Sequence, residues 1–147
     1  MISAIGPAFG SGKAQPILAA AHALVVGLRL ADVSRLLVVG GDGSLVVAHG
    51  VQAVDVPGDP ELCRPIPLAQ REALESYRTV DDLDWTYVSP VEEIGSRPHR
   101  GDYQLGHRLM LFSEDGSSHI GYAEGADGVV DCLEHGVHRR ERITLAD

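Results

Sequence analysis

The sequence is poor in basic residues, with 12 lysines and arginines against 21 aspartates and glutamates. Its formal net charge is −9, and three of its arginines gather near the carboxyl terminus, at Arg139, Arg140 and Arg142. A surface that binds nucleic acid or an anionic membrane needs clustered positive charge over a broad face. The composition therefore argues against nucleic acid and membranes as general partners.

Cysteine is also scarce, and long apolar runs are missing. Cys63 and Cys132 are far apart and follow no metal-ligand spacing, so we expect two reduced thiols in a cytosolic protein. The longest apolar stretch, residues 17–30, is interrupted by His22 and Arg29 and is too short to span a bilayer. No basic region followed by an apolar one marks a signal peptide. We expect a cytoplasmic protein of one domain over residues 1–147.

A phosphate-binding loop is suggested by the stretch GPAFGSGK, but its spacing is wrong. Five residues separate Gly6 from Gly12, where the P-loop motif has four. Ala14 follows Lys13, where that motif needs a serine or threonine to hold magnesium. We therefore expect a different role for this loop.

Short β-branched runs alternate along the chain with segments of helical periodicity. The expected strands are residues 2–5, 35–41, 84–90 and 142–146, and the expected helices are residues 14–31, 68–78 and 122–135. Four prolines between residues 57 and 67 predict irregular backbone there. Residues 103–105 and 109–112 are expected to pair as two short strands. This alternation predicts an α/β domain with a mostly parallel sheet.

Loop-forming residues follow three of the expected strands. They are Gly6-Pro7 after the first strand, residues 40–44 after the second and Ser89-Pro90 after the third. The carboxyl ends of parallel strands meet at one edge of a sheet, where ligands of such folds collect. The sequence therefore predicts a ligand crevice at this edge.

Five segments taken together resemble the NAD(P)H-binding, NmrA-like branch of the short-chain dehydrogenase superfamily. They are ISAIGP at 2–7, RLLVVGGDGSL at 35–45, DDLDWTYVSP at 81–90, YQLG at 103–106 and LEHGVHRRERIT at 133–144. The resemblance covers nearly the whole chain. It implies a partial Rossmann-like fold, because members begin with a strand, a glycine-rich turn and a helix that are absent ahead of the segment at residues 2–7.

The same resemblance implies roles for eight residues near the carboxyl ends of the strands. Ser44 stands where a serine faces nicotinamide and substrate, which makes it the candidate catalytic residue. The candidates for contact with the cofactor are Ile5, Gly6, Gly40, Gly41, Ser89, Pro90 and Val91. Purely structural explanations stay open for the same residues. For Ser44 the alternative is a turn serine that bonds its own backbone, and for the glycines and proline it is the ending of a strand or tight packing.

The Tyr-x-x-x-Lys pair of short-chain dehydrogenases cannot form, because Lys13 is the only lysine. Where relatives often carry that pair, this chain has Cys63 and Arg64. Proton donation would then fall to Ser44, to water or to the substrate. His135 and His138 lack a third ligand at suitable spacing, so we expect no metal site.

The resemblance implies hydride transfer from NAD(P)H to a small carbonyl, quinone or flavin-like acceptor in intact relatives. In this chain we expect NAD(P)H binding to be weak or absent, because the pyrophosphate site at the first helix is missing. The alternative is a redox-sensing or partner-binding module that has lost its cofactor.

Two explanations of the short amino-terminal part stay open. The true start codon lies upstream, or the half-protein is real and either works with another chain or has lost cofactor binding. Without the family's first three strands, the strand at residues 2–5 would form a bare sheet edge. Unpaired edges recruit partners, so we expect a homo-oligomer or a complementing chain there.

Overall fold

The computed structural model describes residues 1–7, 13–57 and 64–147. Its centre is a five-stranded sheet with the order β1-β2-β5-β9-β7. These strands span Ile2–Ser3, Arg35–Val39, Asp84–Pro90, Glu141–Ala146 and Gln104–Gly106 in that order. The first four run parallel, and β7 joins β9 antiparallel. The predicted α/β fold with a mostly parallel sheet is confirmed.

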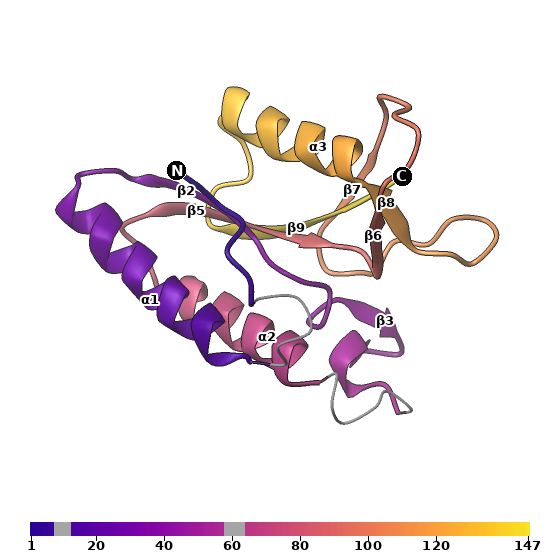
Figure 1. Cartoon of the computed structure of the whole chain (residues 1–147), viewed down its shortest axis with the longest axis horizontal. Coiled ribbons are helices and arrows are strands. Elements are labelled where there is room, and N and C mark those ends of the chain that lie inside the picture. Colours follow the sequence, from indigo (N-terminus) through magenta and orange to yellow (C-terminus); the bar gives the residue numbers. More distant parts are fainter. Residues whose placement is uncertain (8–12, 58–63) are drawn as a thin grey trace.

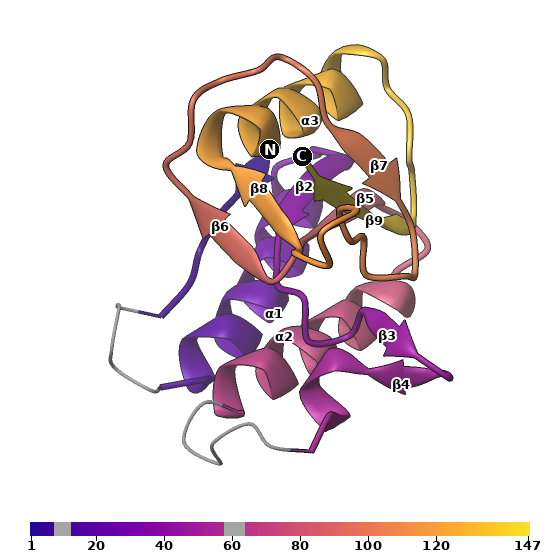
Figure 2. The same ribbon diagram turned by 90° about the vertical axis from the view of Figure 1, so that its right-hand side faces the viewer.

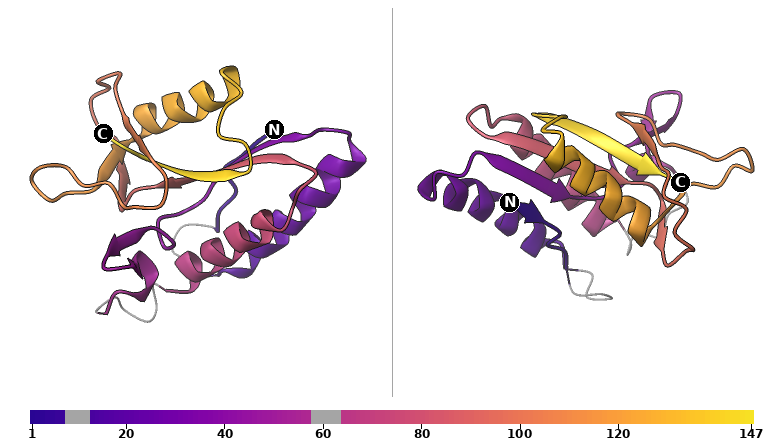
Figure 3. Two further views of the ribbon diagram at one scale, coloured as in Figure 1. Left: turned by 180° about the vertical axis from the view of Figure 1, so that it is seen from behind. Right: turned by 90° about the horizontal axis from the view of Figure 1, so that it is seen from above.

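Helices cover both faces of this sheet. Helices α1 (Gln15–Leu30) and α2 (Pro65–Arg78) lie side by side on one face, and α3 (Tyr122–Glu134) lies on the other, as Figures 1 and 3 show. Gly136, with φ near 62°, follows the end of α3, since glycine adopts this left-handed conformation at little cost. No helix in the described ranges is long and apolar enough to cross a membrane.

Two hydrophobic cores result, one on each face of the sheet. The first packs α1 and α2 against residues such as Leu36 and Tyr87, which point to one face. The second packs α3 against Leu37, Val88 and Ile143, which point to the other. Because strand side chains alternate between faces, the continuous apolar run of β2 serves both cores.

Two small sheets stand at the carboxyl side of the main sheet. Strands β3 (Val46–Ala48) and β4 (Val51–Gln52) form an antiparallel pair, followed by the short 3-10 helix Ala53–Asp55. Strands β6 (Glu93–Gly95) and β8 (His119–Gly121) pair in parallel. Figure 2 shows the first pair beside α2 and the second near the start of α3.

Two expectations about local structure are wrong. Helix α2 begins at Pro65, not Leu68, because Pro65 and Pro67 both lie in its first turn, where no backbone N–H is needed. Residues 103–105 and 109–112 do not pair with each other. Instead β7 pairs with β9, while the Met110 N–H donates to the Val46 carbonyl at 2.9 Å.

Strand β1 lies at the edge of the sheet. Within the described residues it pairs with β2 alone, in the register Ile2 with Leu37 and Ser3 with Val38. The side of β1 that faces away from β2 is therefore open.

Candidate functional site: a crevice at the carboxyl ends of the strands

The turn that follows β2 is fastened to the segment after β4. The Leu45 N–H donates to the Asp42 carbonyl at 2.6 Å, which closes the turn over residues 42–45. The Gly43 carbonyl accepts from the Val54 N–H at 3.0 Å, and the Leu45 carbonyl accepts from the Ala53 N–H at 2.8 Å. These bonds hold the 3-10 helix as a strap beside the carboxyl ends of β2 and β5.

Under this strap is a cavity of about 260 Å³, which we call the strap crevice. Its described lining comes from the ends of β2 and β5, from the strap, from the first turn of α2, and from one residue each of β3 and the segment after β7. It consists of Asp42, Gly43, Val47, Ala53, Val54, Val56, Pro67, Glu92 and Met110. This lining is mostly apolar and carries two carboxylates but no lysine or arginine. The strap crevice therefore favours a small ligand without negative charge.

Ser44 follows the crevice residue Gly43, but its side chain is turned inward and only 4% of the residue is exposed. Its Oγ accepts a hydrogen bond from the guanidinium of Arg142 at 3.3 Å. A hydroxyl has one donor and two acceptor positions, so this bond leaves the Ser44 proton available for another oxygen. The structure thus gives Ser44 a charged partner without testing the catalytic role.

Arg142 is a buried cation, with 7% of the residue exposed. Besides Ser44, it reaches the Arg108 carbonyl at 3.5 Å, and its Nε has no partner among the described residues. Burial lowers the pKa of Arg142 to about 10, and repulsion from Arg78 and Arg108 adds to that effect. Burying a guanidinium that has so few hydrogen-bond partners costs folding free energy.

Two buried hydroxyls belong to the same side of the sheet as Arg142. Ser89 on β5 and Thr144 on β9 are neighbours in register, and neither hydroxyl has a hydrogen-bond partner among the described residues. Side chains alternate along a strand, so Arg142 and Thr144 share the face that α2 covers. The carboxyl side of that face is thus unusually polar for a sheet interior.

Two of the glycines proposed for cofactor contact, Gly40 and Gly41, are tightly packed against the protein itself. A Cβ on Gly40 would lie 2.0 Å from Cζ of Tyr87, and one on Gly41 would lie 1.9 Å from Oε1 of Gln70. The Tyr87 hydroxyl donates to the Gln70 carbonyl at 2.9 Å, and burial raises the pKa of Tyr87 well above its ordinary value. Packing therefore explains both glycines, and their contact with a cofactor stays a prediction.

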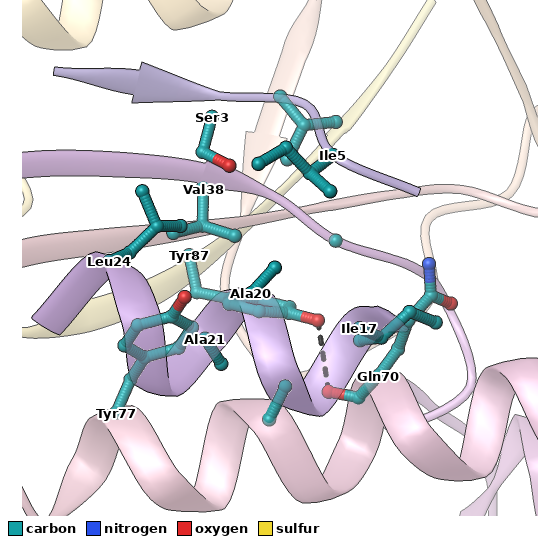
Figure 4. A pocket seen from close by; sticks show the side chains of 13 residues that line it. Ser3, Ile5, Ile17, Ala20, Ala21, Leu24, Val38, Gln70, Tyr77 and Tyr87 are labelled. Carbon is teal, nitrogen blue, oxygen red and sulfur yellow. Dashed lines mark hydrogen bonds between the residues drawn. The ribbon is translucent and has the colours of Figure 1, made fainter. Parts of the chain in front are cut away.

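Ile5 and Gly40 line a small cavity between the start of the chain and helices α1 and α2. Figure 4 shows Ile5 and Ser3 across this cavity from Ala20 and Tyr87. Its volume of about 20 Å³ holds one water molecule at most. The cavity is too small for an adenosine or a ribose in the present arrangement.

The remaining candidates for cofactor contact lie in different surroundings. Val91 is in the core on the α3 face, whereas Pro90 lines an apolar groove of about 360 Å³ on that face. A Cβ on Gly6 would meet no atom within 4 Å, so this position is open. Cys63 lies outside the described residues. Ile5 and Gly40 thus border one space and Pro90 another, and the structure does not gather the eight candidates into one pocket.

The histidines near the end of α3 point to different partners. His135 Nδ1 lies 2.9 Å from the Asp131 carbonyl, and His138 Nδ1 lies 2.7 Å from Glu141 Oε1. In the parts of the chain that the structure describes, no three His, Cys, Asp or Glu side chains are grouped to hold a metal ion.

Sequence patterns did not indicate Glu92, Met110 or Arg142 as neighbours of the site, whereas Asp42 belongs to the loop at residues 40–44 that they did indicate. Glu92 follows β5, so the rule for strand ends could have named it. Met110 and Arg142 are brought there by tertiary contacts, and no spacing in the sequence signals these.

Comparison with known proteins identifies relatives over almost the entire chain. YwnB of Bacillus subtilis, described as an uncharacterized protein, is 38% identical over 97% of this chain and 69% of its own length. A crystal structure from Burkholderia pseudomallei, described as a "putative exported protein", has a TM-score of 0.90 and 39% identity, over 99% of this chain and 70% of that one. A Streptococcus pneumoniae structure, described as "a putative NADH-flavin reductase", has a TM-score of 0.85 and 34% identity over the same shares. No family model matches the sequence.

The chain belongs to the family of NAD(P)-binding, Rossmann-like proteins that includes these relatives, as its resemblance to the NmrA-like branch predicted. It matches the carboxyl-terminal two-thirds of these proteins, and its sheet is the corresponding part of a Rossmann-like fold. Both predictions from the sequence, the family and the partial fold, are confirmed. The strap crevice lies at the carboxyl edge of the sheet, which is the edge where open α/β sheets in general bind ligands.

Proposed function

We propose that the chain forms the acceptor side of an NAD(P)H-dependent oxidoreductase, which transfers hydride to a small carbonyl, quinone or flavin-like acceptor. The observation that carries this proposal is the strap crevice at the carboxyl ends of β2 and β5. Further support comes from the relative described as "a putative NADH-flavin reductase", which is 34% identical to this chain.

The residues that line the strap crevice fit an uncharged ring better than the diphosphate of a dinucleotide. Asp42 and Glu92 in the crevice repel a diphosphate, and no basic side chain is among the described lining residues. The apolar part of the lining suits a flat, uncharged ring. We therefore assign the crevice to the acceptor, and the backbone of residues 89–91 to the nicotinamide end of the cofactor.

Bound NAD(P)H would supply the hydride, and the chain's own residues would orient the acceptor. Ser44 is our candidate for the hydrogen bond to the acceptor oxygen, because Arg142 occupies one lone pair of its Oγ and leaves the proton to donate. The buried charge of Arg142 would favour the negative charge that develops on that oxygen. This Ser44–Arg142 pair would take the place of the missing tyrosine–lysine pair.

A turnover assay tests this proposal. The chain, fused to the amino-terminal segment of YwnB that precedes the matched region, is supplied with NADPH and a panel of aldehydes, quinones and flavins. We expect acceptor-dependent NADPH oxidation, with kcat lowered about 10- to 100-fold by Ser44→Ala.

The matched control is Ser76→Ala on the exposed face of α2, where the hydroxyl only contacts the Glu72 carbonyl at 3.0 Å. This variant should retain full activity. Absence of turnover with every acceptor, in a fusion that is folded and binds NADPH, would contradict hydride transfer.

The second candidate is a non-catalytic redox-sensing or partner-binding module in the cytoplasm. The open edge of β1 and the inward-turned hydroxyl of Ser44 favour it. A protein that binds NADPH tightly but never oxidises it with any acceptor would support this second function over the first.

A further inference from the structure

The strap crevice has negative charge on its wall and, in its described lining, no positive group to balance it. Asp42 and Glu92 are the charged residues of that lining, and the remaining lining residues are apolar or glycine. The whole chain is acidic as well, with a formal net charge of −9. The local charge and the overall charge therefore both attract a cation to this crevice.

Glu92 stands on a fixed stretch of backbone at the rim of the crevice. It is exposed, whereas Val91, which joins it to the end of β5, is only 1% exposed. The next residue, Glu93, donates its backbone N–H to the Ser118 carbonyl at 3.0 Å. A buried residue on one side and a backbone hydrogen bond on the other thus hold Glu92 in place beside the apolar lining.

The Glu92 carboxylate is available to a ligand. The ion pairs formed among the described residues do not include Glu92. Its neighbour Glu93, in contrast, lies 3.6 Å from the guanidinium of Arg97. Of these two adjacent glutamates, the one that lines the crevice is therefore the one without a protein cation.

Two arginines next to the strap have partners of their own. Arg71 forms an ion pair with Asp55 at 2.7 Å, and Arg64 donates to the Val54 carbonyl at 3.1 Å. Neither arginine is among the described residues that line the crevice. The negative charge of the crevice is thus not cancelled from the strap side.

Asp42 brings a second carboxylate from the end of the adjacent strand, β2. The Leu45 N–H closes the turn onto the Asp42 carbonyl at 2.6 Å. A Cβ on Gly43 would lie 2.7 Å from Cβ of Pro67, so this turn is packed closely against the start of α2. Because β2 and β5 are paired in parallel, their ends bring both carboxylates to one crevice.

We propose that the acceptor reduced in the strap crevice carries a positively charged nitrogen, and that Glu92 binds this charge. The inference rests on the proposed function, which places the acceptor in this crevice. The carbonyl carbon of the acceptor takes the hydride, with its electron pair, from NAD(P)H, and the carbonyl oxygen takes a proton from Ser44, which solvent restores. The products are NAD(P)+ and an alcohol that keeps its charged nitrogen.

A divalent metal ion is the main competing occupant of the crevice. Ca²⁺ and Mg²⁺ take about six or more oxygen ligands. No group of three His, Cys, Asp or Glu side chains in the described part of the chain could hold a metal ion. A metal ion would also leave the apolar lining uncovered, whereas an organic cation fills it. We therefore commit to an organic cation.

The first test measures binding, without NADPH and without turnover. Three benzyl alcohols that carry a trimethylammonio, a tert-butyl or a carboxylate group in the para position are titrated into the 147-residue chain and followed by NMR. The first two groups have the same shape and differ in charge. We expect the cationic alcohol to bind about tenfold more tightly than the neutral one, and the carboxylate to bind most weakly.

Glu92→Gln should remove most of this preference, because it deletes the charge and keeps the size of the side chain. Glu93→Gln is the matched control, since Glu93 is the next residue, is exposed and does not line the crevice. It should retain the preference. Equal binding of the cationic and neutral alcohols, a preference that survives Glu92→Gln, or displacement of the cationic alcohol by Mg²⁺ at equal concentration would each overturn the proposal.

The second test uses the fusion protein, NADPH and the corresponding benzaldehydes. The ratio of kcat/KM for the cationic aldehyde to that for the neutral one should fall at least about fivefold in Glu92→Gln and stay unchanged in Glu93→Gln. Reduction of both aldehydes at equal rates would contradict the charge of the acceptor but not hydride transfer. Selective binding of the cation by a protein that reduces no aldehyde would contradict hydride transfer and leave the role of Glu92 in place.

Discussion

Gly40 is tightly packed against a rigid aromatic ring at the carboxyl edge. A Cβ there would overlap the ring of Tyr87, which is buried between α1, α2 and the sheet. We expect Gly40→Ala to lower the free energy of unfolding by about 1–3 kcal/mol, because an overpacked core must shift. Denaturant titration followed by circular dichroism measures this change.

Gly27→Ala is the matched control for this prediction. Gly27 lies within α1, and a Cβ there would meet no atom within 4 Å. Alanine favours the helix over glycine by about 0.5–1 kcal/mol, so this variant should gain stability. A Gly40→Ala protein as stable as the wild type would show that the loop after β2 can move away from Tyr87.

The contacts of single residues could be predicted from the sequence only in part. The rule for strand ends drew attention to Gly40, Gly41 and Ser44, whose roles in a site stay predictions, and the structure gives each a contact within the protein itself. It could not indicate Arg142, because 98 positions separate it from the serine it contacts. The alternation of β9 predicts which face Arg142 occupies, but only the packed fold shows what lies opposite.

At the scale of elements, Asp147 ties the start of α3 to the end of β9. Its Oδ2 accepts from the Gly121 N–H at 2.7 Å, and its Oδ1 contacts Nδ1 of His119. Burial alone would raise the pKa of Asp147, but these two hydrogen bonds outweigh burial and hold it below its ordinary value. We expect Asp147→Asn to cost about 1–2 kcal/mol of unfolding free energy at pH 7.

The pH dependence of this difference follows from the lowered pKa. A carboxyl with a depressed folded-state pKa stabilises above its unfolded value near 4, and the contribution fades as the pH falls through the folded value. Urea titrations at several pH values should show the gap between wild type and Asp147→Asn closing below about pH 4. Asp102→Asn, at an exposed position, should show no such gap. A gap that persists in acid would contradict the assigned role.

The order and type of the main elements follow from the sequence, whereas their pairing partners do not. The β-branched run at residues 35–39 and the apolar run at 84–90 predicted central strands, since strands buried on both faces need continuous apolar character. The pairing of β7 with β9 was missed, because an antiparallel edge strand can be joined from far away. The prolines of α2 led to a predicted start of the helix that is too late, because the first helical turn tolerates proline.

At the scale of the whole molecule, we expect the missing part of the fold to weaken cofactor binding. The described lining of the strap crevice carries two carboxylates and no basic residue, which disfavours a diphosphate. The resemblance to the family implies that a strand–turn–helix for the pyrophosphate precedes the matched region. We expect the 147-residue chain to bind NADPH at least about tenfold more weakly than its fusion to the YwnB segment. Isothermal titration calorimetry on both proteins gives the two dissociation constants, and equal values would contradict this expectation.

The position of β9 has a consequence for how the polypeptide acquires its structure. Residues 141–146 are made after β5 and β7, yet they lie between these two strands with a neighbour on each side. During synthesis the ribosome releases β5 and β7 before β9, so the sheet stays divided until β9 has emerged. A nascent chain that stops before β9 would lack the strand that joins the two parts of the sheet, and quality-control proteases would meet an opened core.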